Sequence, residues 1–557
     1  MGIESKTFAW LSRAPNAPQY LWRRLWMAVH LGRKRLTELV ELSLGRFSPE
    51  LVEDALGKAL RRTPSPATKA RRQLFAVALE LLPVGAGLGF LRSNWSRVRS
   101  DRYARLFAAR WLRKQGSVTM ARGLLRNVDP AEQRLAAQLD SELRTLGSEL
   151  AMPAAAENEP GGGPVAYLLA QALPFHSKGY ATRSHWLLRA LVESGWPIEA
   201  HTRFGYPSDR GDWVELDTAD RTIDLVSYHY HPASRGYRHL TLEEYQRAAV
   251  DSLVATLETE RPALIHAASD FQVGLVGAES ARRLGVPYVY EMRGMWHLSR
   301  AAARPGYYGS EHFELCEQLE LQAARAADRV LVITNALRDF LIDHEIPAQR
   351  IAVVPNGVDP KAFTPQPRPD GVADQLVVGF VGTFNRYEGL DLLIAAFARA
   401  HEKRPHLRLL MVGDGEHKAA LEAQVGAHGL GHVVRFTGRV PHSDVGRYYA
   451  RCELLIYPRR GLPVCEMVSP IKPLEALAMG KAIIRSDVGG HKGLPGAVHS
   501  KDDLDDLARV LEELADDPAK RQDLGRRGRE WVAAERSWSS IARIVGEIYR
   551  ELGVSSR

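Results

Sequence analysis

Two successive series of short apolar strands that alternate with helices constrain the fold of this 557-residue chain most strongly. The first series begins at Val165, and the second follows a proline-rich stretch over Thr364–Pro369. Strands that alternate with helices form parallel sheets whose two faces are both covered. The sequence therefore predicts an α/β fold with two doubly wound, Rossmann-like domains that face a cleft. Ligands of such domains bind beyond the carboxyl ends of the strands, so the residues that directly follow strands are the candidates for function.

The expected elements are as follows. Strands of the first series are Val165–Leu169, Ala263–Ile265, Tyr288–Tyr290, Val330–Ile333 and Ile351–Val354, and its helices include Thr182–Ser194, Leu242–Thr259, Gln272–Leu284 and Glu314–Ala326. Strands of the second are Val377–Val381, Leu407–Val412, Val433–Phe436, Leu454–Tyr457 and Ala482–Ile484, with helices at Gly389–Ala400, Lys418–Gly426, Asp444–Arg451, Pro473–Met479, Asp502–Ala515 and Pro518–Glu535.

The segment that precedes these series differs in composition and charge. Residues 1–150 hold 26 Lys and Arg against 13 Asp and Glu, a net charge of +13, whereas the whole chain carries +8. Leucine-, alanine- and arginine-rich stretches with proline breaks predict an all-α domain here, with helices at Leu21–Val40, Glu50–Arg62, Lys69–Leu82 and Tyr103–Arg113. We expect four parts: this helical domain, a linker over residues 151–163, and Rossmann-like domains over residues 164–365 and 366–557.

Composition narrows the class of protein further. Three widely separated cysteines argue against a disulfide framework and indicate a reducing compartment. We expect no signal peptide, and the apolar run Leu74–Leu91 is interrupted by Glu80, Pro83 and three glycines, which favours buried protein over a membrane span. The predicted location is the cytoplasm.

Three loops of the first series follow strands and carry candidate residues. Lys178-Gly179 is either a ligand-binding loop or a tight turn before a helix. His266 is able to position a hydroxyl or transfer a proton, although a structural histidine is the alternative. Arg293 is a candidate clamp for phosphate or carboxylate, unless it pairs with Glu291 two residues earlier.

The second series repeats a pattern of glycines directly after strands. Gly382 and Gly413 leave room for a diphosphate, and the loop containing Arg439 is placed to meet a nucleotide base. Each signal is weak alone, because glycine turns end many strands, but their recurrence favours one binding edge. The chain has neither a GxxxxGK[ST] loop nor a GxGxxG motif after a strand, which argues against ATP hydrolysis and dinucleotide redox chemistry.

The stretch Ser469–Ile484 carries the strongest local signal. It predicts a loop, a short helix with a proline in its first turn, a glycine stop and a buried strand. Lys472 adds a positive charge where the helix tip already attracts phosphate, and Glu475 is able to accept hydrogen bonds from sugar hydroxyls. A cation beside an acceptor suits a nucleotide sugar, whereas the simpler interpretation is an amphipathic helix with solvated charges.

Together these residues resemble the GT-B glycosyltransferases, specifically glycosyltransferase family 4 (group 1). The resemblance covers the chain from Val165 onward. It is carried by Phe380–Phe397, Val353–Asp359, Leu410–Gly415, Val433–Val440 and Ser469–Ile484. Within that family the stretches Tyr387–Asp391 and Pro470–Ala476 are most similar to bacterial transferases of exopolysaccharide synthesis, including those that accompany exosortase systems.

The resemblance implies roles for individual residues. Glu475 matches the second glutamate of the family's paired motif, which holds the donor ribose. The first glutamate of the motif falls on Met467, so Glu466, one position away, is the candidate replacement. The family's two diphosphate cations fall on Thr383 and Glu388, and neither is a cation here. Lys472, together with Arg386 or Arg293, is then expected to take their place.

The family's strand-end histidine aligns with either Ala268 or His266, and its phosphate-loop glycine pair becomes Lys178-Gly179. The resemblance also places Leu474 among the donor-binding residues. It implies a nucleotide-sugar donor, a glycan or lipid-linked acceptor, retention of anomeric configuration, and neither metal nor cofactor. A nucleotide-sugar epimerase and a non-catalytic binding or scaffold protein on the same fold are the alternatives.

The basic segment over residues 1–150 suggests a further partner. Trp10, Trp22, Trp26, Trp95 and Trp111 lie among arginines, a pattern suited to an anionic membrane surface at which lipid-linked acceptors wait. The hypothesis is peripheral attachment at the inner face of the plasma membrane, and the alternative is a helical domain with a charged outer face. No nucleic-acid-binding motif accompanies the charge.

Overall fold

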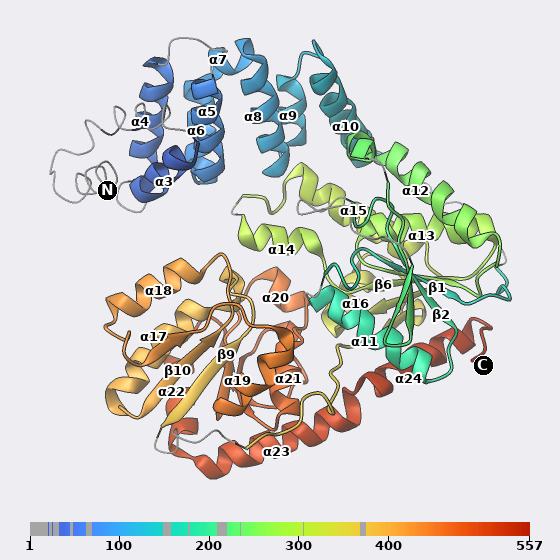
Figure 1. Cartoon of the computed structure of the whole chain (residues 1–557), viewed down its shortest axis with the longest axis vertical. Helices are drawn as coiled ribbons and strands as arrows, with labels where there is room; N and C mark the ends of the chain where they lie inside the picture. Colours follow the sequence, from blue (N-terminus) through green and yellow to red (C-terminus); the bar gives the residue numbers. More distant parts are fainter. Residues whose placement is uncertain are drawn as a thin grey trace. The chain divides into compact units, whose positions relative to one another are not determined.

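A computed structural model describes residues 21, 25, 33–44, 48–62, 69–148, 158–176, 179–208, 220–233, 235–304, 306–367 and 375–556 (Figure 1). The chain divides into two compact units. One consists of Met1–Glu149 with His239–Glu243 and Arg304–Leu315, and the other contains the rest of the chain. Within the described residues, no helix has both the length and the apolar content that a bilayer crossing requires.

The N-terminal unit is helical, as its composition predicts. Its helices are α3 (Arg33–Leu44), α4 (Pro49–Arg62), α5 (Lys69–Leu81), α6 (Val84–Ser93), α7 (Trp95–Ser100), α8 (Arg102–Lys114), α9 (Val118–Leu124) and α10 (Pro130–Leu146). Three of the expected helices are confirmed to within one residue at each end. The fourth, Leu21–Val40, overlaps the first part of α3, and half of its residues lie outside the described ones.

Local signals explain where these helices begin. The Asp101 carboxylate accepts hydrogen bonds from backbone N–H groups in the first turn of α8. Asp129 does the same for α10, whose first residue is Pro130. A buried ion pair between Arg105 and Glu132, 2.8 Å long, then joins these two helices.

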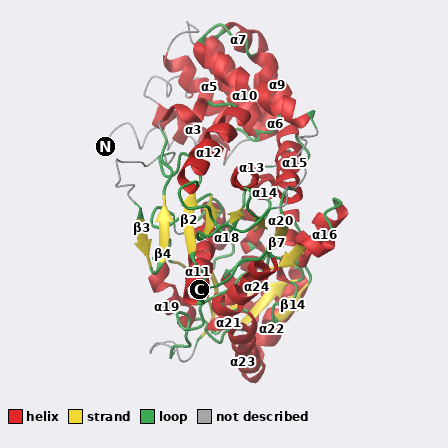
Figure 2. Ribbon diagram, turned by 90° about the vertical axis from the view of Figure 1, so that its right-hand side faces the viewer, coloured by secondary structure: helices red, strands yellow, loops and turns green. Residues whose placement is uncertain are grey.

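The second unit contains two sheets, which Figure 2 shows as strands enclosed by helices. The first has the order β3-β4-β2-β1-β5-β6-β7-β8, in which only the edge pair β3 and β4 is antiparallel. Its strands are β1 (Val165–Leu169), β2 (Ile198–Thr202), β3 (Arg221–Ile223), β4 (Val226–His229), β5 (Ile265–Ala268), β6 (Tyr288–Met292), β7 (Arg329–Val332) and β8 (Ile351–Val353). Its helices are α11 (Gly179–Glu193), α12 (Leu242–Leu257), α13 (Phe271–Leu284), α14 (Trp296–Ala303), α15 (Glu311–Arg325) and α16 (Asn335–Asp343).

The second sheet is parallel throughout, with the order β11-β10-β9-β12-β13-β14. Its strands are β9 (Leu376–Val381), β10 (Leu407–Val412), β11 (Val434–Phe436), β12 (Leu454–Tyr457), β13 (Ala482–Ser486) and β14 (Ala497–His499). Its helices are α17 (Leu390–Lys403), α18 (Lys418–Ala427), α19 (Val445–Arg451), α20 (Pro463–Met467), α21 (Lys472–Ala478), α22 (Leu504–Asp516) and α23 (Pro518–Glu535). The predicted fold class, two doubly wound and mainly parallel sheets that follow a helical region in the chain, is confirmed.

The last helix, α24 (Trp538–Glu551), returns to the first sheet. Trp538, Ile541 and Tyr549 are buried in the same apolar cluster as Tyr167 and Leu169 of β1. The sequence analysis places residues 366–557 with the second sheet. Helix α24 instead packs against α11 and the first sheet. The C-terminal segment therefore contributes helices to both sheets.

Candidate active site

The order of strands in the second sheet identifies the edge at which a ligand would bind. Strand β9 lies between β10 and β12, so the chain moves outward in opposite directions from this central strand. Ligands of open α/β sheets bind outside the carboxyl ends of the strands at such a switch point. Gly382 directly follows β9, and Arg459 lies two residues after β12. The two residues therefore mark the candidate site.

Three charged side chains meet at this point. The ammonium group of Lys472, the first residue of α21, lies 2.5 Å from the Glu388 carboxylate, and the Arg459 guanidinium lies 3.3 Å from the same carboxylate. Glu388 and Arg459 are buried, whereas the Lys472 side chain is 23% exposed. Lys472 is therefore the member of the cluster that solvent or a ligand can reach.

Electrostatics fixes the charge of this cluster. Burial alone would raise the pKa of Glu388, but Arg459 and Lys472 outweigh it and lower that pKa to about 2. Burial lowers the pKa of Lys472, and the Glu388 carboxylate opposes that change. One carboxylate thus faces two cations, which leaves an excess of one positive charge at the carboxyl end of the sheet.

The strand-end glycines permit close packing around this cluster. Gly382 has a φ of 150°, and a Cβ atom added there would lie 2.4 Å from Cε of Lys472. Gly413 has a φ of 137°, and its added Cβ would lie 1.9 Å from the carbonyl oxygen of Gly382. The sequence analysis assigned the space beside Gly382 to a diphosphate. In the structure the aliphatic part of Lys472 fills that space, and the glycine lets the lysine reach the strand end.

Glu475 lies on the same helix as Lys472 but lines a separate cavity of about 310 Å³. Its carboxylate accepts a hydrogen bond of 2.9 Å from the Tyr449 hydroxyl, and His442 lies 3.4 Å away. Thr182 and Trp186 of α11 line the other side of this cavity. The carboxylate of Glu475 is therefore a partly accessible hydrogen-bond acceptor in a cavity lined by aromatic and polar side chains. This position is compatible with the predicted contact to hydroxyl groups.

Glu466 is engaged elsewhere. One of its carboxylate oxygens accepts a hydrogen bond of 2.6 Å from the Gly489 backbone, and the other lies 2.6 Å from the ammonium group of Lys501. No hydrogen bond or ion pair joins it to Lys472 within the described part of the chain. The structure therefore gives Glu466 a role in holding the loop after β13, and its catalytic assignment stays a prediction.

The remaining predicted donor-site residues divide by exposure. Leu474 is 1% exposed in the core of the second sheet, so its side chain supports α21 and is not available to a donor. Thr383, Arg386 and Arg439 are exposed in the loops after β9 and β11. The backbone of Gly413 pairs with that of Gly438, which brings the loops after β10 and β11 together.

In the first sheet, Glu291 is the centre of a buried network. Its carboxylate accepts hydrogen bonds from Arg293 at 2.9 Å, from Arg183 at 3.2 Å and from the Tyr167 hydroxyl at 2.5 Å. Arg293 was expected to clamp a ligand, but it is buried and donates to Glu291, Tyr167 and Ser184. The pairing with Glu291, the alternative considered from sequence, is what the structure contains.

His266 belongs to the same interior. It is 0% exposed, its Nδ1 atom lies 2.7 Å from the Tyr549 hydroxyl of α24, and burial lowers its pKa. Of the two roles considered for His266 from the sequence, catalytic or structural, its burial supports the structural one. Gly179 is the first residue of α11, with open space where a Cβ would stand, and Lys178 lies outside the described residues.

The turn at Val353–Asp359 connects the network to the second sheet. Arg183 donates hydrogen bonds to the Pro355 carbonyl and to the side chain of Asn356, both 2.9 Å long. The Asn356 amide in turn donates to the carbonyl of Ser469, at 2.7 Å, three residues before Lys472. The turn therefore has a structural role, since it links a helix of the first sheet to the loop that carries the candidate lysine.

Sequence reasoning missed Arg459. The signal was present, because the residue follows the predicted strand Leu454–Tyr457 at the edge where functional residues were sought. The Pro458-Arg459-Arg460 segment lacks the glycine that directly follows strands β9 and β10, so it does not share their pattern.

Family models match most of the second unit. The model described as glycosyl transferases group 1 matches residues 366–531, and the glycosyl transferase 4-like domain matches residues 178–357. A mannosyltransferase of Corynebacterium glutamicum, described as GDP-mannose-dependent and acting on a monoacylated phosphatidylinositol monomannoside, is 33% identical over 211 residues. That match spans 35% of this chain and 53% of the relative. The D-inositol 3-phosphate glycosyltransferase of Kineococcus radiotolerans is 28% identical over 56% of this chain and 80% of its own length.

Solved structures show the same fold. Sucrose-phosphate synthase from Thermosynechococcus elongatus superposes with a TM-score of 0.56 at 23% identity, covering 70% of this chain and 99% of that protein. The HepE protein of Anabaena, crystallised in complex with UDP, superposes with a TM-score of 0.55 at 17% identity over 70% of this chain and 100% of its own.

Proposed function

The chain belongs to the group 1 glycosyltransferases of the GT-B fold, and from this premise we propose that it transfers a sugar, with retention of configuration, from a nucleotide-sugar donor to a polysaccharide or lipid-linked glycan. The single observation that supports the donor assignment is the cluster of Lys472, Arg459 and Glu388 at the switch point of the second sheet. The relatives whose names include a nucleotide or a lipid-linked glycan support the same substrate classes.

The chemistry that such a cluster supplies is stabilisation of the departing diphosphate. Cleavage of the bond between the sugar and the phosphate leaves negative charge on the nucleoside diphosphate. An ammonium group held in place before the reaction stabilises that charge without reorganisation. The Lys472 ammonium group has three N–H donors and uses one of them in the hydrogen bond to the Glu388 carboxylate. The other two donors are available to phosphate oxygens.

The buried ion pair of Glu388 and Arg459 also fixes the orientation of the Lys472 side chain. Arg459 also donates a hydrogen bond of 2.8 Å to the carbonyl of Val468, in the loop that leads into α21. One guanidinium therefore fixes both the carboxylate that holds Lys472 and the loop that carries it. In the proposed reaction the departing phosphate helps to deprotonate the acceptor hydroxyl, so the protein acts mainly by positioning and charge.

The test is direct. We expect the purified full-length chain to release nucleoside diphosphate from one of the UDP-, GDP-, ADP- or dTDP-sugars, faster when a lipid-linked or oligosaccharide acceptor is present. A thermal-shift screen with the same nucleotides identifies the base, because a ligand at 100 times its dissociation constant stabilises the folded state by about 2.7 kcal/mol. Release that is unaffected by any acceptor, with formation of a free epimer, would assign epimerase activity instead.

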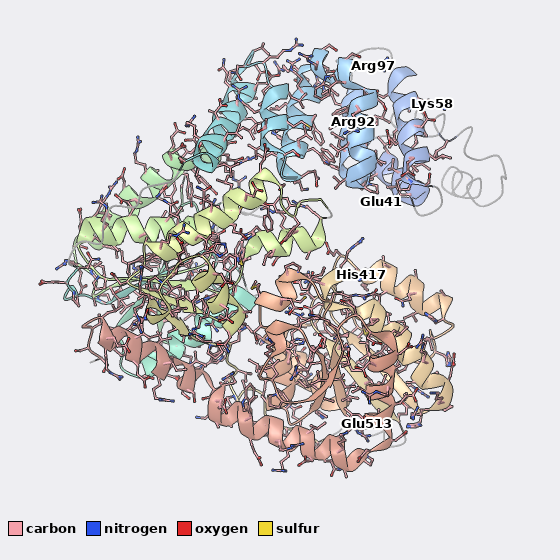
Figure 3. The ribbon with its side chains drawn as sticks, turned by 180° about the vertical axis from the view of Figure 1, so that it is seen from behind. Glu41, Lys58, Arg92, Arg97, His417 and Glu513 are labelled. Atoms are coloured by element: carbon pink, nitrogen blue, oxygen red, sulfur yellow. The ribbon has the colours of Figure 1, made fainter. Side chains whose placement is uncertain are left out.

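We also propose that the helical unit brings the enzyme to an anionic membrane surface. Lys58 and Arg92, which Figure 3 labels on the helices of this unit, are exposed, and Trp95 is 40% exposed. Trp111, which the sequence analysis placed at the membrane, is instead 6% exposed against Gly87, while Trp10, Trp22 and Trp26 lie outside the described residues.

Sedimentation with liposomes tests this attachment. The full chain is expected to bind vesicles rich in anionic lipid at low salt and to lose most binding at high salt, because screening weakens the attraction of basic side chains. A chain that starts at Gly162 is the comparison. Equal binding of the two would show that the helical unit has no part in attachment.

A further inference from the structure

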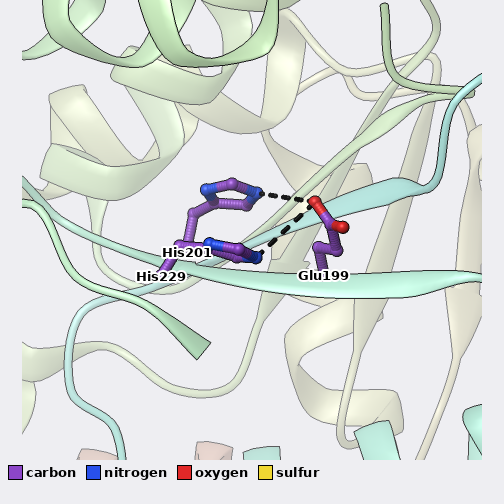
Figure 4. A group of neighbouring side chains, drawn as sticks. All are labelled: Glu199, His201 and His229. Atoms are coloured by element: carbon purple, nitrogen blue, oxygen red, sulfur yellow. Dashed lines mark ion pairs between the residues drawn. The ribbon is translucent and has the colours of Figure 1, made fainter. Parts of the chain in front are cut away.

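A second cluster of chemically reactive side chains lies in the first sheet and has no part in the proposed transfer reaction. It consists of Glu199 and His201 on β2 and His229 on β4 (Figure 4). Strands β2 and β4 pair in parallel, with His201 directly opposite His229. Glu199 precedes His201 by two residues, so both side chains project from the same face of the sheet. The pairing of the strands thus brings the three side chains together.

From this arrangement we propose that Glu199, His201 and His229 form a binding site for a divalent transition metal of the zinc class. Each residue offers one ligand atom, and the three atoms lie within 4.8 Å of one another. Nε2 is the ring nitrogen of each histidine that faces the Glu199 carboxylate. Two imidazoles and one carboxylate are a ligand set that zinc accepts, with a water in the fourth position.

The distances agree with an ion between the groups. The Glu199 carboxylate lies 3.8 Å from Nε2 of His201 and 3.7 Å from Nε2 of His229. Two ligand atoms that each lie about 2.1 Å from one ion stand at most about 4.2 Å apart, so both separations to Glu199 are within range. The 4.8 Å bound on all three ligand atoms is wider than this, so binding requires the two imidazoles to approach each other. The two rings are stacked, with their planes 19° apart, so their Nε2 lone pairs are nearly parallel. Binding one ion therefore requires both rings to turn about their Cβ–Cγ bonds until the ion lies in the plane of each.

Both nitrogen atoms that would bind the metal lack a hydrogen-bond partner. The Nε2 atoms of His201 and His229 are buried and make no hydrogen bond, and the His201 side chain is only 2% exposed. A buried polar atom without a partner is uncommon and needs an explanation such as an ion. The Glu199 side chain is 38% exposed, so the face of the cluster beside it is open to an incoming ion.

The other nitrogen of each ring is already oriented. Nδ1 of His229 lies 2.7 Å from the Asp220 carboxylate, and Nδ1 of His201 lies 3.3 Å from Nε2 of His231. Metal-bound histidines almost always donate their second N–H to a carboxylate or another acceptor, which fixes the tautomer.

The position of the site suggests what the metal does. Strand β4 is second from the edge of the sheet, and only the three-residue strand β3 lies beyond it. An ion bound by His201 and His229 would join β2 to β4 through side chains as well as through the backbone ladder. The expected effect of the ion is therefore to hold β4 against β2 at this end of the first sheet.

Metal titration of the full-length chain without a histidine tag tests the assignment. After treatment with EDTA and dialysis, the protein is expected to bind one Co²⁺ per chain with the visible absorption of a low-symmetry site. Zn²⁺ should displace the Co²⁺ and raise the thermal midpoint, whereas Mg²⁺, which prefers oxygen ligands, should do neither.

Variants locate the bound ion. Glu199→Gln and His229→Gln are expected to weaken Co²⁺ binding by at least about 100-fold, and Asp220→Asn by about 10- to 100-fold, as for other outer hydrogen-bond partners. His428→Gln removes an exposed histidine at the end of α18, outside the first sheet, and should change nothing. Because Glu199 is partly exposed, its variant is expected to fold, and circular dichroism checks this. Absence of a stoichiometric site, or equal binding in Glu199→Gln and the unaltered chain, would overturn the proposal.

Discussion

Replacing Lys472 by methionine is expected to lower kcat for sugar transfer by on the order of 10²–10³, which is typical for the loss of one preorganised contact to a developing anion. Methionine retains much of the aliphatic stem that packs beside Gly382 but removes the ammonium group. If Lys472 acts mainly on the departing diphosphate, kcat falls more than KM rises, because the contact strengthens as charge develops. Steady-state rates of nucleoside diphosphate release measure both quantities.

A matched variant separates charge at this position from charge in general. Lys492→Met removes an exposed lysine from the same domain and is expected to leave kcat unchanged. Lys472→Met also leaves Glu388 with Arg459 as its remaining charged partner, so the thermal midpoint must be measured alongside the rate. A folded Lys472→Met enzyme with a normal kcat would remove Lys472 from the proposed mechanism.

The fold was predictable from the sequence because strands buried on both faces are nearly continuous apolar runs. Strands such as Val165–Leu169 and Leu407–Val412 have the expected bounds. Strands β2 and β4 were not predicted. Ile198–Thr202 and Val226–His229 contain polar residues, so neither stretch is the continuous apolar run that indicates a buried strand. The interior there accepts histidines because neighbouring histidine and carboxylate groups bond to them.

The candidate site was predictable only in part. Lys472 and Glu475 were recognised because a charged residue at the start of a short helix has a local signature. The partner of Lys472 was not, since Glu388 lies 84 positions away in sequence and its pairing depends on how β9 and β12 meet. Arg293 was predicted to bind a ligand for the same reason. Its guanidinium donates hydrogen bonds to Glu291, Tyr167 and Ser184, and the last two lie more than 100 residues away in sequence.

The buried network of the first sheet carries the second large prediction. Glu291→Ala is expected to lower the free energy of unfolding by about 3–5 kcal/mol, the range for removing one partner of a buried ion pair. The loss is large because Arg183 and Arg293 would both stay buried without their carboxylate. Urea or thermal unfolding of the full chain, followed in the transition that disrupts the first sheet, measures the change.

Comparison with an exposed pair isolates the effect of burial. Glu193→Ala removes the partner of Arg189 on α11, where both side chains are more than one-third exposed, and should change stability by less than about 1 kcal/mol. A similarly small effect for Glu291→Ala would show that the two buried arginines find other partners or water, and that the network is not a major source of stability.

The pH dependence follows from the same charges. Burial alone would raise the pKa of Glu291, but Arg293 and Arg183 outweigh it and hold that pKa well below its ordinary value. A carboxyl group with a depressed pKa in the folded state contributes stability above its unfolded pKa and loses it as the pH falls toward the folded value. The unaltered chain should therefore lose stability faster than Glu291→Ala as the pH falls below about 4, near the ordinary pKa of a glutamate. The difference between the two proteins would then narrow in acid, whereas a difference independent of pH would indicate that lost packing, not lost charge, destabilises the variant.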